Sequence, residues 1–215
     1  MQEEILTLYT ILHQRYGPQG WWPGDTPLEV AVGAILTQNT NWQNVALAIE
    51  RLKQAGLLTA SALYELPEAA LAEYIRPAGY YNIKARRLKN FLELLFSRYG
   101  GVMKAMAANT LEVLRPQLLA VNGIGPETAD SILLYALDQP TFVVDAYTFR
   151  ILSRHGLAPD PCSYEDLQGI CTAALPPDIQ VYQEYHALLV RTGKEHCRPR
   201  PRCGDCPLKG FTGFP

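Results

Sequence analysis

Two features of the sequence carry groups that could take part in a reaction. Gly123-Ile124-Gly125 lies between two apolar segments, and Asp145 stands in the otherwise apolar stretch TFVVDAYTFRIL. A tight Gly-x-Gly turn is expected to need positive φ and to leave backbone N–H groups pointing outward at the start of the next helix. Those donors, together with the helix dipole, suit one phosphate group of a nucleic-acid backbone.

Asp145 would then act on a nucleotide that the turn holds by its backbone. A carboxylate can stabilise an oxocarbenium-like sugar and orient a water molecule, which is the chemistry that breaks an N-glycosidic bond. Each feature also has a simpler explanation, because Gly-x-Gly occurs in ordinary helix–helix corners and aspartate is a common N-cap. The occurrence of both at this spacing favours the catalytic interpretation.

The elements that must position these residues are predicted to be helices. Apolar residues repeat with helical spacing in about ten segments, and no convincing strand pattern is present. Thr26-Pro27-Leu28-Glu29 and Ser163-Tyr164-Glu165-Asp166 have the form of capping boxes. The predicted helices are Glu3–Tyr16, Pro27–Thr37, Trp42–Gln54, Pro67–Ile75, Ile83–Tyr99, Leu111–Val121, Gly125–Leu137, Ala146–His155, one after Ser163, and Ile179–Thr192.

Length and composition limit the class of protein. The 215 residues suffice for one large or two small domains, and the net charge of −2 means that nucleic-acid binding would depend on local patches. No apolar run approaches the roughly 20 residues of a membrane span, and no signal peptide is visible, so no membrane partner is expected. The five cysteines suit a reducing compartment, which predicts a cytoplasmic, nucleoid-associated protein.

Several stretches resemble the endonuclease III superfamily of DNA glycosylases, the helix-hairpin-helix Gly-Pro/Asp enzymes. VNGIGPETADSILLYAL with FVVDAYTFRIL is similar to the hairpin and aspartate region, ILTQNTNW to the glutamine-bearing turn, and AGYYNIKARRLKN to the G-[LFY]-Y-N-x-K-A segment. The resemblance covers about residues 25–210. It implies an all-α, two-lobed fold, with a six-helix barrel lobe over residues 27–140 and a second lobe built from residues 1–26 and 141–215. DNA would lie across the cleft between them.

The resemblance also implies roles for individual residues. Asp145 would assist departure of the base, and Gln38 would fill the space that the flipped base leaves, although a polar turn residue is a simpler explanation. The KARRLK segment at Lys84–Lys89 would offer positive charge to phosphates, unless it is only a solvated helix face. The residues expected at the DNA are Gln38, Asn39, Lys84, Gly123, Ile124, Gly125 and Thr128.

Position 127 departs from part of the family. Bifunctional members carry a lysine four residues after the first hairpin glycine, and its amine forms a Schiff base with the sugar before the strand is nicked. Glu127 stands there in this chain, and a carboxylate cannot form an imine. The sequence therefore predicts a monofunctional glycosylase without an efficient lyase step, with Lys84 as a less favoured substitute amine.

A base pocket is predicted around the tryptophans, at Trp21, Trp22, Pro23 and Trp42, together with Glu127. Two of the tryptophans could instead belong to the core. Indole faces attract cationic rings by roughly 0.5–2 kcal/mol, and N-alkylated purines such as 3-methyladenine carry such charge. With the missing lysine, this pattern is similar to the 3-methyladenine glycosylases of endonuclease III type and predicts alkylated purines as substrates.

CRPRPRCGDCPL resembles the start of the family's cluster loop, in which four cysteines hold a [4Fe–4S] cluster. Cys197, Cys203 and Cys206 match this loop (197–206), but no cysteine follows Cys206. An iron–sulfur cluster, a zinc ion or a loop without metal all remain open. Any metal here would be structural, because Asp145 carries the chemistry.

The expected partner is double-stranded DNA with a damaged base, bound by a monomer. Two other functions remain open. A glycosylase for oxidised or mismatched bases is possible because residues outside the motifs shape the pocket. A non-catalytic helix-hairpin-helix DNA-binding module is the second, and Asp145 argues against it.

Overall fold

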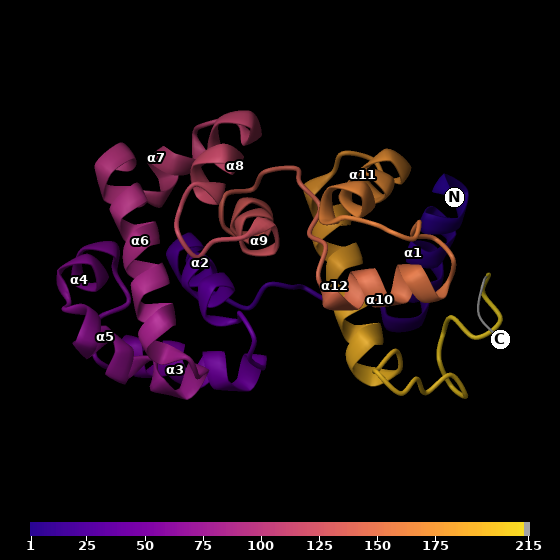
Figure 1. Cartoon of the computed structure of the whole chain (residues 1–215), viewed down its shortest axis with the longest axis horizontal. Helices are drawn as coiled ribbons and strands as arrows, with labels where there is room; N and C mark the ends of the chain where they lie inside the picture. Colours follow the sequence, from indigo (N-terminus) through magenta and orange to yellow (C-terminus); the bar gives the residue numbers. More distant parts are fainter. Residues whose placement is uncertain (213–215) are drawn as a thin grey trace. The chain divides into compact units, whose positions relative to one another are not determined.

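The computed structural model describes residues 1–212, which fold into twelve α-helices and one 3₁₀ helix without a strand (Figure 1). The all-α prediction is therefore confirmed. None of the helices in this part of the chain combines the length and the apolar composition needed to cross a membrane.

Contacts divide the chain into two compact units, which we describe separately. The central unit is Pro23–Gln139, and the terminal unit combines Met1–Trp22 with the chain from Pro140 onward. The sequence placed the boundaries at residues 27 and 140, so the short stretch 23–26 belongs to the central unit instead.

The central unit contains more helices than the six of the predicted barrel. Three short elements had no periodic signal in the sequence, namely α4, α7 and the 3₁₀ helix η1. The elements of this unit are α2 (Pro27–Leu36), α3 (Trp42–Gln54), α4 (Ala60–Glu65), α5 (Glu68–Tyr74), η1 (Arg76–Ala78), α6 (Tyr81–Tyr99), α7 (Met103–Ala107), α8 (Leu111–Leu119) and α9 (Pro126–Ala136).

Helices α2 and α9 form the centre of this unit. All residues from Leu28 to Leu36 are buried in α2, and all from Thr128 to Ala136 are buried in α9. The two helices pack against each other, and α2 also contacts α3 and α6. Each fully buried leucine or isoleucine side chain contributes about 1.5–3 kcal/mol. The Gly-x-Gly turn leads into α9 and the Gln38 turn follows α2, so the most buried helices hold both turns.

Helix α2 begins at the predicted capping residue. Thr26 Oγ1 accepts from the Glu29 N–H at 3.1 Å, and Pro27 occupies the first helical position. The Glu29 carboxylate reaches back to the N–H of Asp25 at 3.1 Å, one residue earlier than in a standard capping box. Lys53 Nζ lies 2.7 Å from carboxylate oxygens of both Asp25 and Glu29, which compensates the buried Glu29 charge.

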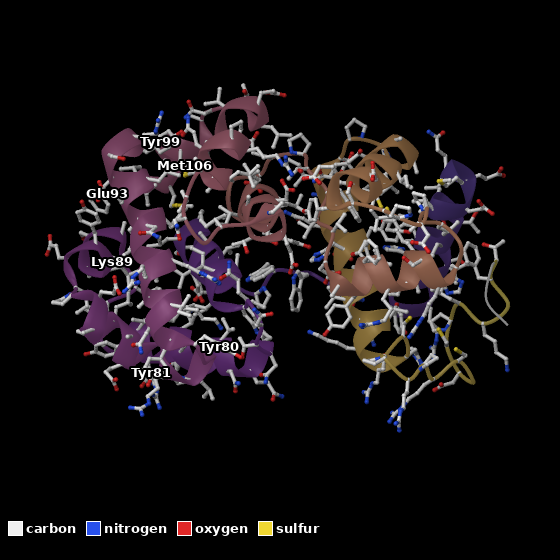
Figure 2. All side chains as sticks on the ribbon, viewed as in Figure 1. Tyr80, Tyr81, Lys89, Glu93, Tyr99 and Met106 are labelled. Atoms are coloured by element: carbon white, nitrogen blue, oxygen red, sulfur yellow. The ribbon has the colours of Figure 1, made fainter. Side chains whose placement is uncertain are left out.

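Helix α6 ties its neighbours together, and Figure 2 labels three of the residues that do so. Lys89 donates from Nζ to the carbonyl oxygen of Tyr64 in α4. The Tyr64 hydroxyl donates to Glu93 Oε2 at 2.8 Å. Tyr99 donates to Gln117 Oε1 of α8 at 2.6 Å. Lys89, one of the basic residues of the KARRLK segment, is thus engaged within the protein.

The terminal unit contains four helices: α1 (Gln2–Tyr16), α10 (Ala146–Arg154), α11 (Tyr164–Ala174) and α12 (Ile179–Glu195). Helix α12 packs against α10 and α1, and α1 also packs against α11. The buried Tyr185 of α12 donates its hydroxyl to the carbonyl oxygen of Ile5 in α1 at 3.1 Å. Its ring also contacts Phe142, with ring centroids 5.8 Å apart.

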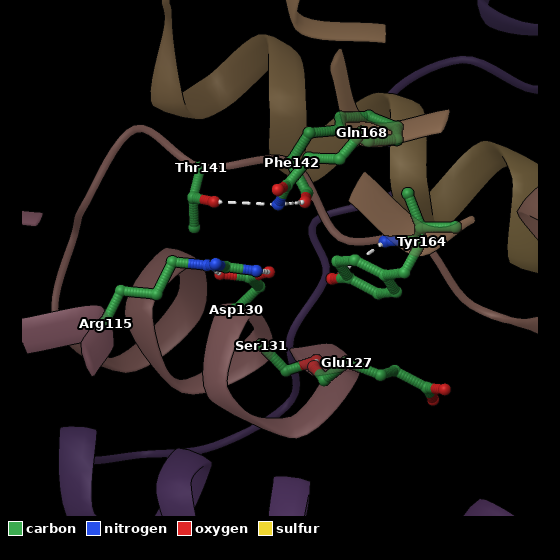
Figure 3. A network of polar contacts seen from close by, with 9 residues as sticks. Arg115, Glu127, Asp130, Ser131, Thr141, Phe142, Tyr164 and Gln168 are labelled. Atoms are coloured by element: carbon green, nitrogen blue, oxygen red, sulfur yellow. Dashed lines mark hydrogen bonds and ion pairs between the residues drawn. The ribbon is translucent and has the colours of Figure 1, made fainter. Parts of the chain in front are cut away.

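An extended segment over residues 140–144 leads directly to Asp145. Residues 141–144 of this segment are buried, and the segment forms no strand. Gln168 of α11 donates from Nε2 to Thr141 Oγ1 at 3.2 Å and to the carbonyl oxygen of Phe142 at 2.7 Å (Figure 3). Tyr164 accepts from the N–H of the last residue of the segment at 3.3 Å. Helix α11 therefore fixes the backbone that delivers Asp145.

Candidate functional site

The Gly-x-Gly turn requires glycine at one of its two positions. Gly123 has φ of +93°, and a Cβ atom added there would lie 2.3 Å from Cγ of Arg87. Gly125 has φ of −92° as the N-cap of α9, and a Cβ atom there would meet nothing within 4 Å. The prediction of positive φ therefore holds for Gly123 and is wrong for Gly125.

The middle residue of the turn faces the protein. The Ile124 side chain is buried, and its N–H donates to the carbonyl oxygen of Val121 at 3.0 Å. Ile124 thus offers neither its side chain nor its N–H group to a phosphate, contrary to the expectation for this residue. Its apolar contacts fix the shape of the turn instead.

The helix that follows the turn begins without a side-chain cap. Gly125 has no side chain, and Pro126 in the first position brings no N–H group. Helix α9 is instead held by α8, because Arg115 of α8 donates to both carboxylate oxygens of the buried Asp130, at 2.9 and 3.1 Å (Figure 3). The uncapped N-terminus keeps the dipole that suits an anion, while the exposed Glu127 in its first turn adds negative charge.

Gln38 lies against the turn. Its Nε2 donates to the carbonyl oxygen of Gly123 at 3.1 Å and to Thr128 Oγ1 at 2.9 Å. Its Oε1 accepts from Arg87. The structure therefore brings together three predicted residues from two distant motifs. Asn39, next in the chain, is exposed with φ of +54°.

Arg87 is a residue of this site that the sequence did not single out. It supports Gly123 by contact and Gln38 by a hydrogen bond. In the KARRLK segment it is adjacent to Arg86, which is exposed and pairs with Glu68 at 3.3 Å. Two neighbouring arginines look alike in the sequence, and only the face of α6 on which each lies separates their roles.

Lys84 does not lie at the surface. It is 1% exposed, and Nζ donates to the carbonyl oxygens of Leu36 at 2.8 Å and Ala78 at 2.7 Å. Burial, with a smaller contribution from the charge of Arg87, lowers the pKa of Lys84 to about 8. The prediction that Lys84 contacts DNA is wrong, because the amine joins α2 to η1 inside the central unit.

Asp145 is the N-cap of α10, and its two oxygens have different partners. Oδ1 accepts from the N–H of Thr148 at 2.7 Å and from Thr148 Oγ1 at 2.9 Å. Oδ2 lies 3.5 Å from Nε2 of His186 on α12. Burial opposes ionisation, but the hydrogen bond and charge of His186 and the bonds from Thr148 outweigh it. The pKa of Asp145 therefore lies below its usual value.

The Trp21-Trp22 pair lies in a loop that α12 holds. The two rings meet edge to face with centroids 5.6 Å apart, and both are half-buried. The Glu184 carboxylate accepts from the N–H groups of the two residues before the pair, at 2.7 and 3.0 Å. Lys194 Nζ lies 5.4 Å from the centroid of the Trp21 ring. Pro23 and Trp42 belong to the central unit, where Trp42 begins α3.

Arginines of α10 hold the C-terminal cysteine loop. Arg150 donates to the carbonyl oxygen of Cys197 at 2.7 Å. Arg154 lies 3.3 Å from Cys197 Sγ and donates to the carbonyl oxygens of Arg198 at 2.7 Å and Pro199 at 2.9 Å. The loop surrounds a solvent-open hollow of about 420 Å³, whose lining includes His196, Cys197, Cys203 and Cys206.

The residues of this loop do not fit a [4Fe–4S] cluster. Such a cluster takes four thiolates, and the loop has three. Within residues 1–212, no group of three or more histidine, cysteine, aspartate or glutamate side chains is arranged to hold a metal ion. The contacts from α10 hold the loop by hydrogen bonds to its backbone.

Residues 32–177 match the family described as HhH-GPD superfamily base excision DNA repair protein. The chain belongs to this superfamily and is a DNA repair glycosylase of that class. It is 49% identical over 211 residues to MJ1434 of Methanocaldococcus jannaschii, a provisionally named DNA repair glycosylase, covering 97% of this chain and 96% of that protein.

Two solved structures share the fold. The H. pylori 3-methyladenine DNA glycosylase MagIII, bound to 1,N6-ethenoadenine, has a TM-score of 0.78 with 27% identity, covering 90% of this chain and 97% of that one. A trapped covalent intermediate of endonuclease III with DNA has a TM-score of 0.83 with 21% identity, covering 97% and 93%. At the latter identity the similarity concerns the fold alone.

Proposed function

We propose that the protein is a monofunctional glycosylase that removes an N-alkylated purine, such as 3-methyladenine, from double-stranded DNA. The carboxylate of Asp145 would face the sugar of the extrahelical nucleotide. As the bond between C1′ and the base nitrogen breaks, its electron pair leaves with the base. A water molecule then adds to C1′ and gives up a proton, leaving an abasic site and the free base.

The observation that carries this proposal is the state of Asp145. Its side chain is 11% exposed, is oriented by Thr148 and His186, and has a pKa below its usual value. A buried carboxylate that stays ionised can stabilise positive charge on a sugar, because low local dielectric strengthens the attraction. An N-cap needs one carboxylate oxygen, so the second oxygen is available for another role.

Two residues are the basis for proposing that the enzyme has no lyase step. Glu127 occupies the position at which bifunctional relatives carry a lysine, and it cannot form an imine. Lys84, the alternative amine, is buried and donates to two carbonyl oxygens. The reaction would therefore stop at the abasic site.

The proposed substrate follows from the aromatic residues of the loop. Trp22 and Trp21 offer indole faces to a cationic purine, and Lys194 already lies over the Trp21 ring. We therefore expect Trp22 to contribute more of the stacking energy. The H. pylori neighbour at 27% identity, a 3-methyladenine glycosylase, supports the same substrate class.

The grip on DNA would come from the Gly123 turn and the uncapped start of α9, with Gln38 and Asn39 beside it. A wedge role for Gln38 would require its bonds to Gly123 and Thr128 to break when DNA binds. The protein would act as a monomer, in the cytoplasm at the nucleoid.

A base-release assay tests the proposal. Duplexes containing 3-methyladenine, 8-oxoguanine or a T:G mismatch are incubated with the wild type, Asp145→Asn and Asp178→Asn. Asp178 is the matched control, because it is the N-cap of α12 and accepts from Val181 N–H at 3.1 Å. We expect release of 3-methyladenine by the wild type and Asp178→Asn, and a loss of about 10²–10⁴-fold in Asp145→Asn.

The other outcomes separate the alternatives. Release of the oxidised or mismatched base in place of 3-methyladenine would replace the proposed substrate. DNA binding without release of any base would leave only a DNA-binding module. An undiminished rate in Asp145→Asn would show that another residue carries the chemistry and would overturn the role proposed for Asp145.

A further inference from the structure

His186 is a buried polar residue on the most central helix of the terminal unit. Its side chain is 6% exposed, and Nε2 lies 3.5 Å from Oδ2 of Asp145. A buried imidazole is costly unless its polar atoms interact with other groups. Its position beside the only carboxylate of the proposed mechanism therefore calls for a function.

The contacts of Asp145 separate its structural role from a second one. The N–H and the hydroxyl of Thr148 both donate to Oδ1, which completes the N-cap of α10. Oδ2, which the cap does not use, faces His186. Removing the imidazole would therefore leave the helix cap in place and release only the second oxygen.

Helix α12 fixes the position of the imidazole. Tyr185, the preceding residue, is fully buried and bonded to the backbone of α1. Leu188 and Leu189, on the following turn, are also buried. The same helix packs along α10, so its backbone sets the distance between the imidazole and the carboxylate.

We propose that His186 is the positioning residue for Asp145, holding Oδ2, the carboxylate oxygen that the helix cap does not use, in the orientation and the ionised state needed at the sugar. This inference rests on the function proposed for Asp145. The groups of the described chain that act on the Asp145 carboxyl are His186 on α12 and Thr148 on α10, and of these only the imidazole can carry charge.

The test uses full-length protein and a 3-methyladenine duplex under single-turnover conditions. His186→Phe keeps the ring and removes the nitrogen atoms, and His186→Gln keeps a side-chain donor. His155→Phe is the matched control, because His155 is a second buried histidine of the same unit, at the end of α10. Circular dichroism and the thermal midpoint establish that each variant is folded.

We expect His186→Phe to lower the single-turnover rate about 10-fold to 100-fold, with the dissociation constant for DNA changed by less than about threefold. The acid limb of its pH–rate profile should move to higher pH. Without the imidazole, burial raises the pKa of the Asp145 carboxyl, so the ionised form is lost at a higher pH. His186→Gln should recover part of the rate, and His155→Phe should match the wild type.

A double variant distinguishes positioning from a general structural effect. In the Asp145→Asn background, adding His186→Phe should lower the rate no further, because the imidazole acts through the carboxylate. An equal loss in both backgrounds, or an unmoved acid limb, would overturn the inference. If Asp145→Asn itself retained full activity, the proposed function would fail first, independently of His186.

Discussion

Arg87 and Gly123 are in contact across the central unit: a Cβ atom on Gly123 would lie 2.3 Å from Cγ of Arg87. The same arginine donates to Gln38, and Gln38 donates to the carbonyl oxygen of Gly123 at 3.1 Å. These three residues come from separate parts of the chain and form a closed set of contacts. The Gly123 turn, which would bind the DNA backbone, and the Gln38 turn, which would enter the duplex, are thus joined by direct contacts.

The two glycines of the turn should respond differently to alanine. Gly123→Ala should lower the free energy of unfolding by at least about 1–2 kcal/mol, because φ of +93° is unfavourable for alanine and Arg87 must move. Gly125→Ala should lower it by less than about 1 kcal/mol, since the added methyl group meets open space and only the weaker N-cap preference of alanine counts against it. Urea unfolding of the two variants beside the wild type measures both values.

The DNA affinity of these variants gives a second comparison. Gly123→Ala should also weaken binding to an undamaged duplex, because the Gln38 and Arg87 contacts shift with the turn. Equal stability losses at positions 123 and 125 would refute the steric account of the turn.

Local signals in the sequence predicted most long helices well. Thr26 and Ser163 cap helices at the predicted positions, because a cap depends only on residues within one turn. The short helices α4 and α7 were missed, since five or six residues are too few for a periodic pattern. Their positions depend on packing against α6, which local sequence does not record.

Lys84 shows where residue type misled the interpretation. It lies on the same stripe of α6 as Leu88, Phe91 and Leu95, which are buried. Helical spacing alone would have placed Lys84 inside, but its charge suggested the surface. Its partners lie on α2 and η1, so the contacts themselves could not be predicted. His186, also buried, was not singled out by the sequence.

Lys84 should make stability depend on pH. The pKa of about 8 in the folded protein lies below the ordinary value of 10.5, so between these values the unfolded chain holds a proton that the folded chain has lost. Stability should therefore rise with pH across this window, by roughly 1–3 kcal/mol relative to Lys84→Met.

Guanidinium unfolding at several pH values between 7 and 10.5 measures this difference. Lys104→Met, at an exposed site, is the control and should show a constant difference from the wild type. A flat difference for Lys84→Met as well would mean that the amine keeps its ordinary affinity for protons inside the protein.

Arg154 should determine how firmly the cysteine loop is held. Its guanidinium donates to the carbonyl oxygens of Arg198 and Pro199. In Arg154→Met these bonds are lost, and we expect limited trypsin digestion to cut the loop about tenfold faster or more, in proportion to the easier local opening. Arg98→Met, on helix α6 of the central unit, should leave the cutting rate unchanged. Protection that persists in Arg154→Met would show that another interaction holds the loop.

A lysine at position 127 should give the enzyme the lyase step that the wild type lacks. Glu127 is exposed in the first turn of α9, so an amine can replace its carboxylate without changing the core. Treated with borohydride on a 3-methyladenine duplex, the wild type should give no covalent adduct, because it has no amine at this position to form an imine. Glu127→Lys should give a trapped adduct and some strand cleavage.

Glu165→Lys is the matched control, since Glu165 is an exposed acidic residue in the first turn of α11, and it should give no adduct. An adduct in the wild type that disappears in Lys84→Met would instead identify the buried amine as the nucleophile and make the enzyme bifunctional.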